Sequence, residues 1–94
     1  MNEEILLKEK PETVAVPVID GFSVQITYFR DLKSQLGHLM SASYDGLPLP
    51  NPDAKKTSCD IIETLRKKHD VRFQDEFHAR KHIKNALRGN FTQN

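Results

Sequence analysis

The chain has 94 residues, of which 29% are charged and 37% are hydrophobic, and its formal net charge is +1. This length favours a single domain with a modest core. Cys59 is the only cysteine, which excludes an internal disulfide, and no apolar run is long enough to cross a membrane. We therefore expect a cytoplasmic protein that has no membrane partner.

The charge is unevenly distributed along the chain. Residues 1–54 contain four Lys or Arg and eight Asp or Glu, a net charge of −4, whereas residues 55–94 contain ten and five, a net charge of +5. A basic half of this kind is typical of a surface that binds nucleic acid or an acidic protein. The charge pattern therefore directs the search for a binding surface to the C-terminal half.

The best-specified stretch is residues 13–29, which predict an antiparallel β-hairpin. Apolar residues alternate with small or polar ones on both sides of Asp20-Gly21. A two-residue loop at Asp20-Gly21 would leave neither face of the hairpin cleanly apolar. A three-residue loop, residues 19–21, gathers the apolar side chains on one face. The predicted pairs are Val18 with Phe22, Val16 with Val24, Val14 with Ile26 and Pro17 with Ser23.

The hairpin also suggests a surface for pairing with another chain. Pro17 has no backbone N–H and predicts that the first strand lies at an edge of the sheet. The second strand, residues 22–29, contains neither Pro nor Lys, which usually protect a free edge. We expect this edge to pair with a second copy, as a homodimer, or with a strand of a partner protein. The predicted pairing residues are Val24, Ile26 and Tyr28.

The rest of the chain predicts three short helices. Asp31 is a good N-cap for a helix over residues 32–42, in which apolar residues recur at helical spacing. The prolines of residues 44–56 predict a loop. Helical spacing then predicts two more helices, over residues 58–69 and 75–88.

Together these elements predict an α+β fold in the order β-β-α-loop-α-α. Residues 13–89 form one small domain, with a flexible arm at residues 1–12 and a flexible tail at residues 90–94. Because a two-stranded hairpin is not stable alone, its valine face must be covered by helices of the same chain, by a partner subunit or by both. The residues expected to cover it are Leu32, Leu36, Leu39, Ile61, Leu65, Ile83 and Leu87.

Eight cations lie on the last two predicted helices and between them. If residues 70–73 form a short turn, these helices form a helix-turn-helix unit whose second helix reads DNA. The same cations could instead bind an acidic protein surface or form a solvated face. The candidate binding residues are Arg66, Lys67, Lys68, Arg72, Arg80, Lys81, Lys84 and Arg88.

A metal site would have to be built around the last predicted helix. Asp75, His78 and His82 share one face of it, and two histidines four residues apart can chelate Zn²⁺. A structural zinc site needs four ligands, and nothing in the sequence requires Cys59 and His69 to converge with them. We predict no metal and no cofactor.

The sequence also lacks the motifs of common enzymes. A glycine-rich phosphate loop, Gly-x-Ser-x-Gly and Cys-x-x-Cys are all absent. Cys59 and His69 are separated by about 15 Å along one helix, too far to act as nucleophile and base. We expect Cys59 to be partly buried, and we predict that the protein is not an enzyme and has no small-molecule substrate.

These observations favour a small regulatory protein that binds and modulates a larger protein. The alternative is a DNA-binding transcriptional regulator that uses the basic helix pair as a dimer. Small size, a polarised charge and the lack of a catalytic motif are typical of accessory proteins encoded by phages and other mobile elements.

Overall fold

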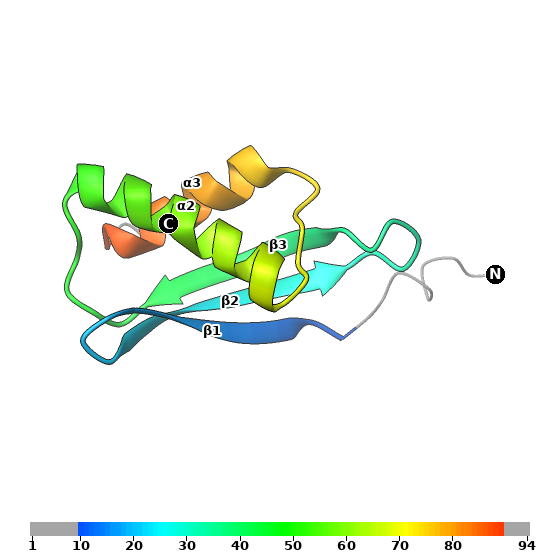
Figure 1. The fold of residues 1–94 in the computed structure, drawn as a ribbon, viewed down its shortest axis with the longest axis horizontal. Coiled ribbons are helices and arrows are strands. Elements are labelled where there is room, and N and C mark those ends of the chain that lie inside the picture. Colours follow the sequence, from blue (N-terminus) through cyan, green and yellow to red (C-terminus); the bar gives the residue numbers. More distant parts are fainter. Residues whose placement is uncertain (1–9, 90–94) are drawn as a thin grey trace.

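The computed structural model of the protein describes residues 10–89, which form one small α+β domain. An antiparallel sheet has the strand order β1-β2-β3, and two helices lie together on one of its faces (Figure 1). The α+β class is thus confirmed, whereas the order β-β-α-loop-α-α is wrong. The elements are β1 (Glu12–Ile19), β2 (Phe22–Arg30), β3 (Gly37–Tyr44), α2 (Asn51–Lys68) and α3 (Glu76–Leu87).

The two predicted ends of the chain fall mainly outside the described part. Residues 1–9 of the expected arm and the expected tail, residues 90–94, are not among the described residues. Glu12, the last residue of the predicted arm, is the first residue of β1.

The register of the predicted hairpin is largely confirmed. Val16 pairs with Val24, and Pro17 pairs with Ser23, as the apolar alternation requires. Val14 likewise pairs with Ile26, and β1 lies at an edge of the sheet, as its proline predicts. The hairpin therefore presents one apolar face to the helices.

The tip of the hairpin differs from the prediction. Ile19 pairs with Phe22, which leaves a two-residue loop, Asp20-Gly21, with φ values of 45° and 83°. Two positive φ values match the turn that best suits a two-residue hairpin loop. The register then shifts between Pro17 and Ile19, where β1 contains a bulge. Because of this bulge, the two-residue loop is compatible with the pairing that places the apolar side chains on one face. The three-residue loop and its Val18–Phe22 pair are wrong.

The predicted helix over residues 32–42 is also wrong, because β2 continues through a loop into β3. Asp31 accepts a hydrogen bond from the backbone N–H of Lys33 at 2.9 Å, which lowers the pKa of the Asp31 carboxyl below its ordinary value. This bond resembles an N-cap, but it belongs to a turn. The Asp31 N–H donates to the carbonyl of Leu36 at 2.8 Å, so the chain folds back to pair with β2.

A bulge explains why β3 resembles a helix in the sequence. Its pairing with β2 shifts register so that Met40 is an extra residue in the strand. Consequently Leu39 and Ala42, three residues apart, both pack against the core. A spacing of three is typical of a helix face, whereas a regular strand places every second residue on one side.

Of the two remaining helices, α3 matches its prediction more closely. Its N-cap is Asp75, whose carboxylate accepts the backbone N–H of His78 at 3.0 Å. The other helix, α2, begins at Asn51 rather than at residue 58, so the predicted loop over residues 44–56 is too long. Pro52 lies in the first turn, where its missing N–H removes no helical hydrogen bond.

The core lies between the inner face of the sheet and the two helices. Strand residues Val24 and Ile26 are completely buried, and so are Leu65 of α2 and Ile83 of α3. The predicted contribution of Leu32 is wrong, since it is 40% exposed. The predicted core residues that are buried are Ile61, Leu65, Ile83 and Leu87, and Leu39 packs beside them from β3.

Residues 69–75, called the linker here, connect α2 to α3 and are anchored to β3. Gly37 of β3 donates to the carbonyl of Arg72 at 2.7 Å and accepts from the N–H of Gln74 at 3.0 Å. A Cβ at Gly37 would lie only 3.3 Å from the side chains of Val71 and Phe73, so any larger residue would require these side chains to move by a few tenths of an ångström. The linker is therefore part of the packed domain.

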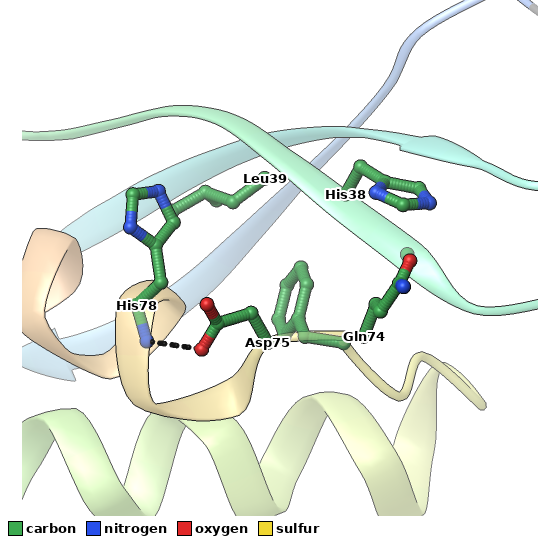
Figure 2. A pocket seen from close by; sticks show the side chains of 7 residues that line it. His38, Leu39, Gln74, Asp75 and His78 are labelled. Carbon is green, nitrogen blue, oxygen red and sulfur yellow. Dashed lines mark hydrogen bonds between the residues drawn. The ribbon is translucent and has the colours of Figure 1, made fainter.

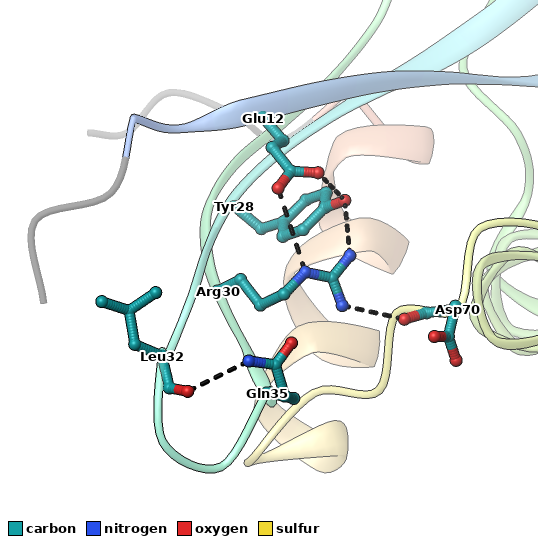
Figure 3. A network of polar contacts seen from close by, with 6 residues as sticks. All are labelled: Glu12, Tyr28, Arg30, Leu32, Gln35 and Asp70. Carbon is teal, nitrogen blue, oxygen red and sulfur yellow. Dashed lines mark hydrogen bonds and ion pairs between the residues drawn. The ribbon is translucent and has the colours of Figure 1, made fainter.

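A polar network also holds the start of the linker to the sheet (Figure 3). Arg30 donates to the carbonyl of Asp70 at 2.9 Å and lies 3.9 Å from the carboxylate of Glu12. The hydroxyl of Tyr28 donates to Glu12 at 2.7 Å. Burial of the ring and this hydrogen bond raise the pKa of Tyr28 above its ordinary value.

None of the outward-facing residues that pair across the sheet, on the side away from the helices, is Asp, Glu, Lys or Arg. Cross-strand rows such as Ala15–Gln25–Ser43 and Thr13–Thr27–Ser41 run across it. The hydroxyls of Thr13 and Thr27 lie 3.1 Å apart, which places both side chains on the same side. We call this surface the uncharged face; it comprises Thr13, Ala15, Pro17, Ser23, Gln25, Thr27, Phe29, His38, Ser41 and Ser43.

Candidate functional site

A groove between α2 and α3 gathers cations from both helices. The two helices pack side by side, and α3 runs back along α2 because the linker reverses the chain (Figure 1). The groove has a volume of about 350 Å³. We call it the basic groove; its lining residues are Lys55, Ser58, Phe77, Arg80, Lys81 and Lys84.

An aromatic ring and a guanidinium group lie together in the basic groove. Phe77 is 67% exposed, although large apolar side chains are usually buried. The guanidinium carbon of Arg80 lies 5.8 Å from the centre of the Phe77 ring, within range of a cation–π contact. The groove therefore offers an apolar surface beside positive charge.

The floor of the groove belongs to α2. Ser58 is completely buried, and its hydroxyl donates to the carbonyl of Lys55, one turn earlier, at 2.8 Å. This hydroxyl is thus hydrogen-bonded within α2. The groups in the groove that can bind a charged ligand are therefore the cations. Among residues 10–89, no carboxylate lies within 4.0 Å of the nitrogens of Lys55, Arg80, Lys81 or Lys84.

Two other predicted binding residues are already paired. Arg66 donates to the carboxylate of Glu76 at 3.1 Å, which ties the end of α2 to the start of α3. Lys67 lies 3.1 Å from Glu63 one helical turn away, and this contact lowers the pKa of the Glu63 carboxyl. Both cations therefore have local partners and present less free charge than the groove cations.

The remaining three predicted cations do not join the groove. Lys68 borders a shallow depression that also contains Asp60 and Glu63. Arg72 of the linker borders a different cleft, beside Arg30, and Arg88 is the C-cap of α3. The structure thus brings together only three of the eight predicted residues.

Lys55, Ser58 and Phe77 complete this group, although the prediction of binding residues omitted them. Three prolines precede Lys55 and predict a loop at this position. Proline and aspartate are both favoured in the first turn of a helix. The adjacent residues Pro52 and Asp53 therefore signal that a helix begins here. A helix that begins at Asn51 would have placed Lys55 on the same helix as Ser58.

The predicted pairing edge at Val24, Ile26 and Tyr28 is wrong. These residues belong to β2, which is hydrogen-bonded to β1 on one side and to β3 on the other. Their side chains are at most 1% exposed and lie in the core. The free backbone edges of the described sheet belong to β1 and β3.

His38 of β3 and His78 of α3 line a second pocket, of about 270 Å³. Figure 2 shows that the imidazoles of His38 and His78 lie apart, while the Asp75 carboxylate turns to the backbone of α3. The rings of His78 and His82 are 4.4 Å apart between centres. Within residues 10–89, no three His, Cys, Asp or Glu side chains are placed to hold a metal ion.

Two further expectations concern Cys59 and the membrane. Cys59 is exposed on α2, so the expectation that it is partly buried is wrong. Neither helix within residues 10–89 is both long enough and apolar enough to cross a membrane.

Comparison with known proteins gives no relative from which a function could be transferred. No protein-family model matches the chain, and neither a search of curated proteins nor a search of solved structures finds a similar protein.

Proposed function

We propose that the protein is a non-enzymatic regulator that binds an acidic segment of a larger protein in the basic groove. The observation that carries this proposal is the clustering of four cations around one exposed aromatic ring, Phe77. Carboxylates of the partner would neutralise the cations, and an apolar side chain beside them would cover the ring.

The size of the positive surface favours a short acidic segment over a duplex. Arg80 and Lys84 are about 6 Å apart along the axis of α3, and Lys55 faces them from α2. This footprint suits a few carboxylates. A duplex is normally held by phosphate contacts spread over several base pairs.

A DNA-binding regulator is the second candidate, since unpaired cations also attract phosphates. A helix-turn-helix unit, however, joins its helices with a turn of about three or four residues. Here residues 69–75 intervene and are bonded to β3. DNA binding through α3 would therefore need a geometry other than the predicted one.

The test is fluorescence anisotropy with a labelled Asp/Glu-rich peptide that contains one tryptophan, and with labelled mixed-sequence duplex DNA. A triple variant, Lys55→Ala, Lys81→Ala and Lys84→Ala, removes three groove charges. The matched control, Lys56→Ala, Lys67→Ala and Lys68→Ala, removes three charges from α2 outside the groove. Both triples change the net charge equally, so a general field effect would weaken binding equally.

We expect the groove triple to weaken peptide binding at least about tenfold and the control triple to change it by less than about threefold. Phe77→Ser should also weaken peptide binding. Phe22→Ser, which changes another exposed phenylalanine, should leave peptide binding unchanged. Equal losses in the two triples would contradict the proposal. Tighter binding of the duplex than of the peptide, lost in the groove triple, would instead support the DNA-binding candidate.

A further inference from the structure

The basic groove holds positive charge that no carboxylate among residues 10–89 balances at close range. None of these carboxylates lies within 4.0 Å of its four cations. Arg80 and Lys84 are like charges one helical turn apart on α3, an arrangement that destabilises a helix unless opposite charge lies nearby. Phe77 beside them is 67% exposed. A segment that carries both carboxylates and apolar side chains would relieve both conditions.

We propose that residues 1–9, called the N-terminal segment here, dock in the basic groove of their own chain, so that a partner must displace them. The segment contains three Glu and one Lys, a net side-chain charge of −2, and the apolar run Ile5-Leu6-Leu7. Its carboxylates complement the groove cations, and its apolar run complements the ring of Phe77. Residues 90–94, at the other end of the sequence, contain no Asp or Glu. The inference rests on the proposed function, since it names what occupies the same groove when no partner is bound.

The N-terminal segment is long enough to reach the groove. Glu12, at the start of β1, lies 3.9 Å from Arg30, which donates to the carbonyl of Asp70 just after α2 (Figure 3). The groove residue Ser58 lies ten residues before Lys68, the end of α2, or about 15 Å along the helix axis. An extended segment of nine residues spans about 30 Å. The segment therefore covers the distance from the end of α2 to the groove.

Because the N-terminal segment is tethered to the domain, even a weak contact suffices to fill the groove. A binding segment joined to its site by a short linker has an effective concentration in the millimolar range. Docking with a dissociation constant of about 0.1–1 mM would therefore occupy the groove in at least about half of the molecules. A partner then binds with an affinity reduced by the fraction of grooves that are open.

The first test uses Cys59, the only cysteine, which is exposed on α2 one residue after Ser58. A nitroxide spin label on Cys59 of the full chain broadens the NMR signals of amides that lie near the groove. The labelled wild type is compared with the groove triple, the control triple and a third variant. This third variant, the segment triple, replaces the carboxylates of the N-terminal segment: Glu3→Gln, Glu4→Gln and Glu9→Gln.

We expect the label to broaden the amide signals of residues 3–9 in the wild type and in the control triple. Dilution should leave this broadening unchanged, because the contact lies within one chain. The broadening should be lost in the groove triple and in the segment triple. A wild type without broadening, or broadening that persists in both of those triples, would overturn the proposal. So would broadening that disappears on dilution, since the segment would then occupy the groove of another copy.

The second test measures binding of the acidic tryptophan peptide to the unlabelled chain by fluorescence anisotropy. The segment triple should bind the peptide at least about threefold more tightly than the wild type, because the competing segment is weakened. A matched control removes three exposed carboxylates elsewhere and should gain less than about twofold. Its substitutions are Asp20→Asn, Asp45→Asn and Asp60→Asn.

The two tests separate a failure of this inference from a failure of the proposed function. Equal peptide affinity in the wild type and the segment triple, or equal gains in the segment triple and its matched control, would overturn the docking of the N-terminal segment alone. Broadening of the segment signals in a protein that binds no acidic peptide, even as the segment triple, would instead contradict the proposed function.

Discussion

The two surfaces of the domain differ in chemistry although they enclose the same core. The helical side carries the basic groove, with long cationic side chains and an exposed phenylalanine. The outer side of the sheet carries mostly small polar side chains, in rows that run across the strands. Strand alternation sends apolar residues inward and small polar ones outward, whereas helices display long charged side chains to solvent. One small fold can thus separate a charged surface from a neutral one.

The largest expected effect comes from the core that both surfaces share. Ile83 is completely buried between α3 and the sheet, so Ile83→Ala should lower the free energy of unfolding by about 2–5 kcal/mol. Urea unfolding followed by circular dichroism measures this loss. Peptide binding in the basic groove should then fail wherever the variant is unfolded. Peptide binding that survives under those conditions would show that the groove does not depend on this core.

A smaller loss is expected where the linker meets the sheet. Gly37→Ala would force a methyl group against Val71 and Phe73, and we expect a loss of about 1–3 kcal/mol in the free energy of unfolding. Because this contact fixes the start of α3, the basic groove should be disturbed more than the uncharged face. Amide hydrogen exchange distinguishes these two regions. Relative to the wild type, we expect faster exchange in the linker and unchanged exchange in β1. Wild-type stability in this variant would mean that the close approach is not required.

The polar network at Tyr28 should contribute less and should depend on pH. Tyr28→Phe removes the hydrogen bond to Glu12 and should lower the free energy of unfolding by about 0.5–1.5 kcal/mol at neutral pH. The pKa of Tyr28 is raised in the folded state, so its contribution is complete below the ordinary value of 10.0. That contribution is lost as the pH rises through the folded-state pKa.

The stability difference between wild type and Tyr28→Phe should therefore shrink under strongly alkaline conditions. Urea unfolding of both proteins at neutral pH and above pH 10.0 measures this change. A difference that grows with pH would contradict the raised pKa.

The smallest expected effect concerns the groove cations. Lys81→Ala removes an exposed charge that has no ion pair among the described residues, so the free energy of unfolding should change by less than about 0.5 kcal/mol. Urea unfolding measures this free energy, and Lys68→Ala, on the other helix, is the control variant. A large loss in Lys81→Ala alone would indicate that this lysine serves folding rather than binding.

Much of the fold was predictable where residue type and spacing point to the same structure. The pairing of Val16 with Val24 followed from the alternation, and Asp75 was recognisable as the start of α3. The error at residues 32–42 has a physical cause. Leu32, Leu36, Leu39 and Met40 recur at helical spacing, although Leu32 and Met40 are exposed in the structure. Asp31 caps a turn with the same kind of hydrogen bond that begins a helix.

The candidate site was predictable only in part, because it depends on how two helices pack. The cations of α3 were recognisable from their spacing. No local pattern places Lys55 opposite Lys84, since the reversal of the chain depends on the bonds between Gly37 and the linker. For the same reason, the sequence does not reveal that Arg66 is neutralised by Glu76.

The most direct test of the division between the two surfaces is a two-dimensional NMR titration of the full chain with the acidic tryptophan peptide. The protein should be kept at a concentration where it is in one oligomeric state. We predict that the amide signals of Lys55, Phe77 and Lys84 shift progressively, while those of Gln25 and Ser43 on the uncharged face do not. Shifts centred on Gln25 and Ser43, with the groove signals unchanged, would contradict the account.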